Sequence, residues 1–500
     1  MSEYILTIDV GTTAIKVAVF DSDLKCVCTE REEYSLITAA STIEMDPDGY
    51  MDAIYSAVRR MLNGRQHIAD DIAAIVPTSQ GETIIPVNAD GKALRNAIVW
   101  LDGRAEAQAI SLSEAVDTTQ FYLTTGVPEL TGVVPVCKVM WIREQEPHIF
   151  RNTYKILMVA DWVILNLAQR FVTDKGVVTS SGYYDIINDR YYTELIRAAG
   201  LPEDLFPETV DSGTPVGIIS PAAAEKLGIN KNAIVMAGSM DQPAGFLAMG
   251  GMNPGVFMEA TGTCLTIAAS CSNPAISSNL CPVIYRDILP DSYLIEPVCM
   301  TAGVVLKWFR DEFCSEFKND DNAFRYMDEY AQTVPPCSEG LVMLPYFSGI
   351  TTPEVNPDAK GVLFGLQLGM GKPHIIRAIM EAVGYMLREN VAIIEQAAGI
   401  ECTEIRSMGG GANSDLWLQM KADICNRPIV KMKYTECTSL GAAIIGAVSL
   451  KWYKSYKEAA EKGNVVEKIF KPDPHNADLY SRGFQKYQRL YASLRSLFRE

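Results

Sequence analysis

Two Gly-Thr turns, half a chain apart, carry residues that could bind phosphate. The first turn is Asp-Val-Gly-Thr-Thr at residues 9–13, between two apolar, β-rich runs that together span residues 4–20. The second is Glu-Ala-Thr-Gly-Thr at residues 259–263, between similar runs over residues 256–268. Such a pattern predicts a β-hairpin, and the N–H groups and hydroxyls of its turn can hold phosphate oxygens. Taken alone, the first turn is better explained as an ordinary β-turn, but two matching turns favour phosphate binding in a duplicated architecture.

The side chains of these turns suggest distinct roles. Asp9, beside the first turn, supplies the kind of oxygen that a hydrated Mg²⁺ prefers, and the ammonium of Lys16 could neutralise part of a phosphate's charge. The predicted phosphate contacts are Gly11, Thr12, Thr13, Lys16, Thr261, Gly262 and Thr263.

A third glycine cluster, Gly-Gly-Gly-Ala-Asn at residues 409–413, follows a strand-like run at residues 404–407 and opens a predicted helix. Glycine lets the backbone approach a ligand closely, and a helix N-terminus favours anions. The alternative is a tight strand-to-helix turn capped by Asn413 or Ser414. Together with the two Gly-Thr turns, this cluster predicts a nucleotide site.

Asp241 is the candidate general base. It follows a buried strand-like run at residues 233–238 and opens a predicted helix that has Pro243 in its first turn. A carboxylate in a cleft could take the proton of a substrate hydroxyl while that oxygen attacks the γ-phosphorus of ATP. The alternative role of Asp241 is that of a helix N-cap.

Two polar loops offer carboxylates and amides that could bind the hydroxyl groups of a polyol. They are Thr-Ser-Gln-Gly-Glu-Thr at residues 78–83 and Trp-Leu-Asp-Gly-Arg at residues 100–104. Ordinary solvated loops are the alternative. With the residue after Asp241, the candidate substrate contacts are Gln80, Glu82, Thr83, Trp100, Asp102, Arg104 and Gln242.

Alternating strand-like and helix-like runs must position these residues, and such alternation predicts an α/β fold with a mixed sheet. Strands are expected at residues 72–77, 84–88, 97–100 and 233–238, and helices at residues 50–62, 104–116, 153–168 and 221–227. In the second half, helices are expected at residues 374–398, ending at Gly399, and at residues 414–425, 439–452 and 480–498. A cluster of Gly, Asn and Pro near residues 247–255 predicts the boundary between domains 1–247 and 248–500.

Composition excludes several classes of protein. Five hundred residues favour two cores, and the net charge of −17 without a basic run argues against nucleic-acid or membrane partners. Neither a leader nor a long apolar span is evident, and the 12 scattered cysteines fit a cytoplasmic protein with free thiols. No P-loop, HExxH or Gly-x-Ser-x-Gly motif occurs in the sequence.

The ordered set of motifs resembles the FGGY carbohydrate kinases, the family of glycerol kinase and xylulokinase. Nearly the whole chain takes part, including residues 361–365 and 374–381, which are similar to the family's C-terminal signature, and residues 439–443, which are similar to its late Gly-Ala-Ala helix. The motifs that carry the resemblance are residues 9–13, 80–83, 100–104, 238–242, 261–263 and 409–414.

The resemblance implies two actin-like (ribonuclease-H-like) domains with a catalytic cleft between them, ATP and Mg²⁺ as cofactors, and a small sugar or polyol as substrate. In that scheme Asp241 is the base, Asp9 and Asp241 serve the metal, and Gly410, Gly411 and Asn413 border the adenine nucleoside. The first domain would bind the sugar and the second the nucleotide. The implied activity is transfer of the γ-phosphate of ATP to a hydroxyl of a ketose or sugar alcohol.

Departures from the family pattern bear on the substrate. Glycerol kinases carry Arg-Glu-Thr where this chain has Gly81-Glu82-Thr83, which removes a cationic donor and should open space, and Leu265 stands where their pocket has Phe. The Met-His pair of xylulokinases is absent too, although residues 100–104 are more like theirs. We therefore expect a xylulokinase-like enzyme, with glycerol kinase as the alternative.

Two alternatives come from other classes of protein. An actin-like or chaperone-like ATPase switch would share the phosphate hairpins but would not need Glu82, Asp102 and Asp241 together. A non-catalytic sugar sensor would more simply have lost Asp241. Association into a homodimer is left open.

Overall fold

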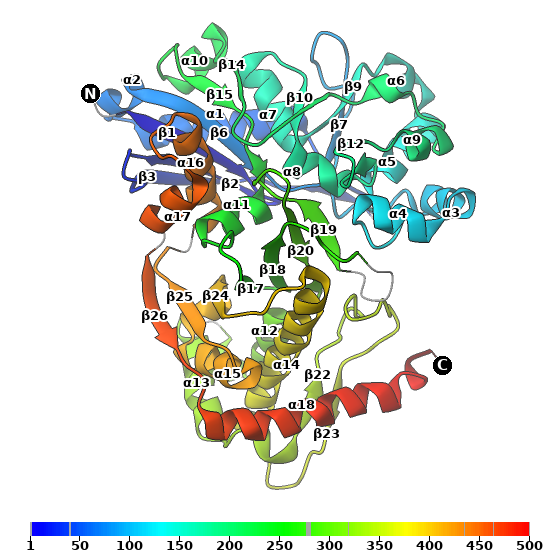
Figure 1. Ribbon diagram of the computed structural model, residues 1–500, viewed down its shortest axis with the longest axis vertical. Helices are drawn as coiled ribbons and strands as arrows, with labels where there is room; N and C mark the ends of the chain where they lie inside the picture. Colours follow the sequence, from blue (N-terminus) through cyan, green and yellow to red (C-terminus); the bar gives the residue numbers. More distant parts are fainter. Residues whose placement is uncertain are drawn as a thin grey trace. The chain divides into compact units, whose positions relative to one another are not determined.

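The computed structural model describes residues 3–39, 42–276, 282–318, 320–434, 436–463 and 465–499 (Figure 1). The chain forms two compact units. The first unit comprises Met1–Gly250, Ile284–Tyr293 and Glu436–Asn464, and the second comprises Gly251–Val283, Leu294–Thr435 and Val465–Glu500.

The central sheet of the first unit is built on the first predicted hairpin. β1 (Tyr4–Val10) and β2 (Ala14–Phe20) pair antiparallel, so that Asp9 lies opposite Lys16. β1 also pairs parallel with β6 (Ile72–Ser79). Both faces of β1 are buried, which explains its nearly continuous apolar sequence. The strand order is β14 (Pro215–Ile218), β15 (Ile234–Met236), β6, β1, β2 and β3 (Cys26–Glu33), and β16 (Ser239–Met240) also pairs with β6.

Helices cover this sheet because their apolar residues recur on one face. In α1 (Pro47–Leu62), which packs on β2 and β3, the N-cap Asp46 precedes Pro47, and buried residues such as Tyr50, Ile54 and Met61 follow the helical period. The other helices of the unit are α2 (Gln66–Asp70), α3 (Glu106–Ala115), α4 (Thr118–Thr125), α5 (Pro135–Gln145), α6 (Pro147–Asn152), α7 (Val159–Ala168), α8 (Lys175–Val178), α9 (Thr193–Ala198), α10 (Pro221–Leu227), α11 (Asp241–Ala248), α16 (Cys437–Ser449) and α17 (Tyr456–Gly463).

Residues 436–464, which the sequence analysis assigned to the second domain, belong to the first unit. Helix α16 packs against β1, β6 and α11, and in Figure 1 its orange ribbon lies beside the blue β1. Glycines permit this approach: a Cβ on Gly441 would lie 1.8 Å from the carbonyl oxygen of Ala244, and one on Gly446 would lie 2.9 Å from Val76. The sequence predicted a continuous second domain over residues 248–500, whereas the contacts return this late helix to the sheet of the first unit, because packing is not visible in the order of the sequence.

A smaller sheet of the first unit carries the polar loops. Its order is β4 (Ile37–Ala39), β5 (Thr42–Met45), β8 (Ala97–Ile98), β7 (Ile84–Val87) and β9 (Lys155–Met158). Residues 153–168 were predicted to be a single helix, but β9 takes their first part and pairs with β7. Two further pairs are β10 (Val172–Asp174) with β13 (Glu208–Val210) and β11 (Tyr184–Asp185) with β12 (Arg190–Tyr191).

The second unit repeats the hairpin arrangement. β17 (Val256–Thr261) pairs antiparallel with β18 (Leu265–Cys271) and parallel with β24 (Glu404–Met408), as β1 does with β2 and β6. This confirms the duplication expected from the two turns. Further strands of this sheet are β20 (Tyr293–Glu296), β21 (Val298–Cys299), β25 (Ile429–Met432) and β26 (Val466–Phe470).

Five helices and one hairpin complete the described part of the second unit. The predicted long helix is α14 (Lys372–Ala398), which ends at Gly399 in the left-handed conformation, with φ 65°. The other helices are α12 (Gly303–Phe313), α13 (Ala323–Gln332), α15 (Asp415–Cys425) and α18 (Pro474–Leu494), and the hairpin pairs β22 (Val342–Leu344) with β23 (Val362–Phe364).

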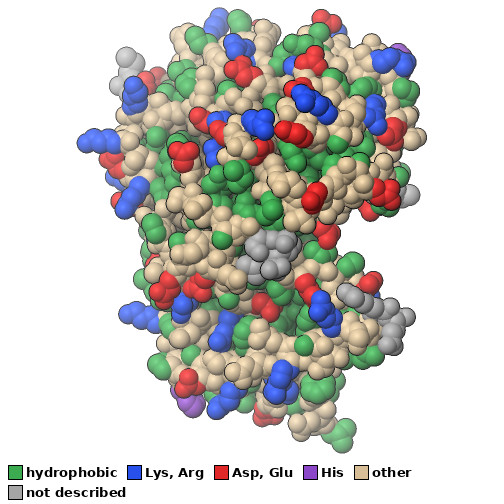
Figure 2. Space-filling view, turned by 45° about the vertical axis from the view of Figure 1, so that its right-hand side comes forward, with side chains coloured by type: hydrophobic (Ala, Val, Ile, Leu, Met, Phe, Trp, Pro, Cys, Tyr) green, Lys and Arg blue, Asp and Glu red, His purple; other side chains and the backbone are tan. Residues whose placement is uncertain are grey.

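One face of the molecule carries charged side chains of both signs beside hydrophobic ones (Figure 2). On the face that Figure 2 shows, acidic and basic side chains are interspersed. Within the described residues, the helices are too short or too polar to span a bilayer.

Candidate active site

Asp9 and Asp241 lie close together in the first unit. Asp9 is the second-to-last residue of β1 and is 8% exposed, and its Oδ1 accepts a hydrogen bond from Thr78 Oγ1 at 3.5 Å. Burial, and next the negative charge of Asp241, raise the pKa of Asp9 to about 7. Burial raises the pKa of Asp241 to about 6. The first Gly-Thr turn and the candidate base therefore share one acidic corner.

The N-cap alternative for Asp241 is wrong. Strand β16 runs directly into α11, so Met240 is the N-cap and Asp241 is the first residue of the helix. Its Oδ1 accepts the backbone N–H of Gln242 at 2.7 Å, and the side chain is partly exposed. A carboxylate in this position is accessible to a ligand.

Lys16 is not a free cation. It lies opposite Asp9 across the hairpin, and its Nζ is 2.6 Å from Oε2 of Glu436, just before α16. The sequence could not reveal this partner, because Glu436 comes from the late segment that joins the first unit. A phosphate contact by Lys16 would have to compete with this ion pair.

Two amides of the predicted substrate set have unsatisfied acceptors. The Oε1 atoms of Gln80 and Gln242 are buried and make no hydrogen bond. Gln80 Nε2 donates to the hydroxyl of Tyr50 at 3.5 Å. Buried acceptors normally have a donor, so these two oxygens suit the hydroxyl groups of a bound ligand.

Glu82 lies close to Asp241. Its backbone is left-handed, with φ 63°, and its side chain is partly exposed. Burial raises the pKa of Glu82, the ammonium of Lys138 draws it back down, and the charge of Asp241 adds to the rise. Glu82 therefore belongs to the same electrostatic cluster as Asp241.

Gly81 does not open space for the substrate. A Cβ there would lie 2.7 Å from Met240 Sδ and 2.9 Å from Ser180 Oγ. The expectation of a roomier site at this position is wrong, because Met240 and Ser180 fill the volume.

Asp102 and Arg104 support the second polar loop from inside. Asp102 is fully buried, and its oxygens accept from Arg104 Nε at 2.8 Å, from Arg104 NH2 at 2.7 Å and from the backbone N–H of Ile43. Arg104 also pairs with Glu44 at 2.8 Å and stacks on Trp141 at 4.9 Å. We expected both residues to contact substrate, but the structure commits their polar groups to protein partners.

Trp100 connects the polar loops to the first turn. Its indole N–H donates to Thr12 Oγ1 and its backbone N–H donates to Thr83 Oγ1, both at 3.0 Å. Thr83 is fully buried, so its hydroxyl joins the two loops rather than facing a ligand. The sequence placed these residues in candidate binding loops but could not show that they bond to one another.

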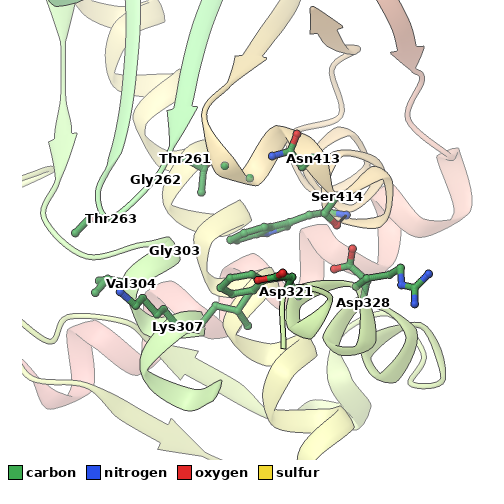
Figure 3. A pocket seen from close by; sticks show the side chains of 16 residues that line it. Thr261, Gly262, Thr263, Gly303, Val304, Lys307, Asp321, Asp328, Asn413 and Ser414 are labelled. Carbon is green, nitrogen blue, oxygen red and sulfur yellow. Dashed lines mark hydrogen bonds between the residues drawn. The ribbon is translucent and has the colours of Figure 1, made fainter. Parts of the chain in front are cut away.

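The second unit contains a cavity of about 640 Å³ where the second turn meets the glycine cluster. In Figure 3, Thr261, Gly262 and Thr263 border it from the turn, while Asn413 and Ser414 border it from the start of α15. Packing holds these parts together, since a Cβ on Gly411 would lie 2.8 Å from Thr261 Cβ. The predicted residues that line the cavity are Thr261, Gly262, Thr263, Gly410, Gly411 and Asn413.

The cavity also contains residues that the sequence analysis missed. They come from α12, α13 and the segment before α13, which have no motif of their own, and only the fold brings them to the glycine cluster. They include Gly303, Val304, Lys307, Asp321, Phe324, Arg325 and Asp328.

A buried ion pair holds the second turn in place. Lys421 and Glu259 are both fully buried, 2.7 Å apart. Thr261 Oγ1 accepts from Lys421 Nζ and donates to Glu259 Oε2, each at 2.7 Å. The hydroxyl of Thr261 is therefore already bonded within the protein, and a phosphate contact by Thr261 would have to use another of its groups.

The site suits a metal ion that takes only a few ligands from the protein and the others from water or phosphate. Among the described residues, no group of three or more His, Cys, Asp or Glu side chains could hold a metal ion. Asp9 and Asp241 offer two carboxylates. Mg²⁺ is commonly bound by one or two carboxylates together with water and phosphate oxygens, so the pair suits this ion.

Comparison with known proteins identifies the class of the molecule. The model of the N-terminal domain of the FGGY family of carbohydrate kinases matches residues 4–248, and that of the C-terminal domain matches residues 260–450. The chain therefore belongs to the FGGY family of carbohydrate kinases. It has the two-domain, ribonuclease-H-like and actin-like fold of that family, and it is a phosphotransferase with an alcohol group as acceptor. Sugar kinases of this family use ATP.

The similar proteins differ in substrate. The chain is 26% identical to the xylulose kinase of Bacillus subtilis (strain 168), over 99% of this chain and 98% of the relative. It is 28% identical to the gluconokinase of the same strain, over 89% and 87%. The ligand-bound xylulose kinase from Lactobacillus acidophilus superposes with a TM-score of 0.91 at 25% identity, over 99% of both chains. The gluconate kinase from that organism gives 0.89 at 26%, over 99% and 98%.

Replacing Lys421 by Met should destabilise the second unit and weaken nucleotide binding. The change leaves Glu259 as a buried, unpaired charge, which costs about 3–5 kcal/mol. We expect a lower Tm and a higher Kd for ADP, measured by differential scanning calorimetry and isothermal titration calorimetry. Lys468→Met removes an exposed pair with Asp415, 2.7 Å apart, and should cost at most about 1 kcal/mol. If the two variants have the same Tm and the same Kd for ADP, the ion pair of Lys421 and Glu259 has no role in holding the turn.

Proposed function

We propose that this protein transfers the γ-phosphate of ATP to a hydroxyl of a neutral ketose or sugar alcohol, with Asp241 as general base. The observation that carries the proposal is the position of this carboxylate, partly exposed and close to both Asp9 and Glu82. An ordinary aspartate has a pKa too low to hold a proton well near neutrality. Burial brings the pKa of Asp241 to about 6, which suits a base that works near pH 7.

The proposed reaction is a single displacement at phosphorus. Asp241 accepts the proton of the sugar hydroxyl while that oxygen forms a bond to the γ-phosphorus. The bond from the γ-phosphorus to the β,γ-bridging oxygen breaks, and ADP leaves with the electron pair. Gln80, Glu82, Trp100 and Gln242 would orient the sugar, and this positioning supplies much of the catalysis in such reactions.

Nucleotide binding is proposed for the cavity of the second unit. Its glycine cluster gives Gly410 and Gly411 without side chains beside the nucleoside, and Asn413 offers an amide. Gly262 and Thr263 would contact phosphate oxygens through the second turn, and Gly11, Thr12 and Thr13 would do so through the first.

Asp9 and Asp241 would hold Mg²⁺. The ion would neutralise the charge that develops on the phosphate oxygens during transfer. The two carboxylates fit this ion because the pKa of each is raised, which means that their ionised forms are unfavourable here. A bound cation would stabilise those ionised forms.

The charge of the site favours a neutral substrate over a sugar acid. Three carboxylates, those of Asp9, Glu82 and Asp241, would repel a carboxylate on the substrate. The cations of the turns and loops are already committed: Lys16 to Glu436 and Arg104 to Asp102. The xylulose kinases among the relatives act on such a neutral ketose, according to their name, whereas the gluconokinases do not. Glycerol is the alternative substrate.

Asp241→Asn should abolish phosphoryl transfer and leave nucleotide binding intact. Losing a general base typically lowers kcat by about 10²–10⁴, while the cavity for the nucleotide is in the other unit. Sugar-dependent ADP release and the Kd for ADP measure the two effects. Asp90→Asn, at an exposed turn of the same unit, is the matched control. An Asp241→Asn enzyme of normal kcat would refute the assignment, and ADP release without any sugar dependence in the wild type would favour an ATPase switch.

Activity should fall in acid. The base works only when ionised, so at saturating Mg²⁺ kcat/KM should be constant well above the pKa of Asp241, about 6, and drop tenfold per pH unit below it. Asp9, with a pKa of about 7, should bind Mg²⁺ less well as it becomes protonated, so raising the Mg²⁺ concentration should move the acid limb to lower pH. Initial rates between about pH 5 and about pH 8 test this. An acid limb near pH 4, or one insensitive to Mg²⁺, would contradict it.

A substrate panel tests the charge argument. We expect D-xylulose or a sugar alcohol of similar size to exceed gluconate in kcat/KM by at least about 100-fold, because opposing two like charges in such a site costs several kcal/mol. Coupled ADP release with D-xylulose, xylitol, glycerol and gluconate gives the comparison. Preference for gluconate would overturn the neutral-substrate proposal and leave the kinase class unaffected.

A further inference from the structure

A fully buried lysine lies beneath the two polar loops. Lys138 belongs to α5 and is 0% exposed. Its Nζ donates to the carbonyl oxygens of Val99 at 2.9 Å, Glu82 at 3.2 Å and Trp100 at 3.2 Å. An ammonium has three protons, so these bonds use all of its donors. They reach two loops that are distant from α5 in the sequence.

A lysine is energetically unfavourable at position 138 if the side chain only fills space. Burying a charge is unfavourable unless its hydrogen bonds are satisfied. Most of the neighbouring buried positions of α5 are apolar, among them Val136, Val139 and Ile142. A hydrophobic residue at position 138 would avoid this cost but would deprive three carbonyl oxygens of this donor. The ammonium is therefore explained by its three bonds, together with its charge beside Glu82.

One of the three hydrogen bonds of Lys138 holds a residue whose backbone conformation is unfavourable. Glu82 has φ 63°, in the left-handed region, which is uncommon for residues other than Gly, Asn and Asp. Such a conformation persists where surrounding contacts fix it. Lys138 binds the carbonyl oxygen of this residue, and Thr83, the next residue, accepts the N–H of Trp100.

We propose that Lys138 is a positioning residue for the sugar: its ammonium fixes Glu82 and Trp100 relative to each other without touching the substrate. The inference rests on the proposed function, in which these two side chains orient the sugar. Because the three acceptors are carbonyl groups, the ammonium acts on the path of the backbone and through it on the direction of both side chains.

Lys138→Met tests the inference by separating sugar binding from nucleotide binding. We expect the KM for the best sugar of the panel to rise at least about tenfold, with the KM for ATP and the Kd for ADP within about twofold of the wild-type values. A general loss of folding would lower the Tm and the active fraction without this selective change in one KM.

Lys155→Met is the matched control. Lys155 belongs to the same unit and also binds two backbone carbonyls, of Asp204 and Phe206, and among the described residues neither polar loop supplies it with a hydrogen-bond partner. Its substitution should leave the KM for sugar unchanged. If it raises that KM as much as Lys138→Met does, the effect is one of general stability and the inference is wrong.

Thr83→Val provides a second and milder variant. It removes the acceptor of the Trp100 N–H at nearly constant volume, and it should raise the KM for sugar about threefold to tenfold. If Lys138→Met fails to fold, Thr83→Val and Lys138→Gln decide the question: an unchanged KM for sugar in both overturns the inference. If the wild-type enzyme phosphorylates no sugar of the panel, the proposed function itself has failed.

Discussion

The proposed chemistry depends on two carboxylates that are close together, with no cation of the described residues in an ion pair with either. Asp9 and Asp241 come from the end of β1 and the start of α11, and each is raised in pKa mainly by burial. Burying two ionised carboxylates close together is unfavourable unless a bound cation or a proton compensates their charge. A divalent ion beside Asp9 and a proton delivered to Asp241 are the two charges that the proposed reaction brings to this corner.

The rest of the first unit keeps this corner in shape. Helix α16, contributed by the late part of the chain, packs on β1 through Gly446 and on α11 through Gly441, and it follows Glu436, the partner of Lys16. Lys138 donates hydrogen bonds to backbone carbonyls of both polar loops, and Arg104 binds Asp102 within the second loop. The second unit has a similar arrangement, because the ion pair of Lys421 and Glu259 anchors the turn that borders the cavity proposed to bind the nucleotide. In each unit a fully buried lysine therefore bonds to a loop or turn that we propose to bind a ligand.

The sequence predicted those parts whose signal is local. Both hairpins, the glycine cluster before α15, the long helix α14 and the place of Asp241 at a helix start could be predicted, since periodicity and turn residues determine them. Residues whose role depends on a distant partner could not. Lys138 and Lys421 look like ordinary helix residues until the fold brings carbonyl or carboxylate oxygens to them. Asp102 and Arg104 were expected at the substrate because a sequence cannot show that they bind each other, and residues 436–464 were misplaced because chain order does not reveal packing. Cytoplasmic location and association into a dimer remain predictions.

Direct titration of the two carboxyl groups tests the central claim. Difference infrared spectroscopy of protein labelled with ¹³C-aspartate, with Asp9→Asn and Asp241→Asn variants to assign the bands, would follow each group through its pKa. The account predicts that Asp241 titrates near 6 and Asp9 near 7, and that removing the charge of Asp241 lowers the pKa of Asp9. Two groups that titrate near the ordinary aspartate value of about 4 and independently of each other would contradict it.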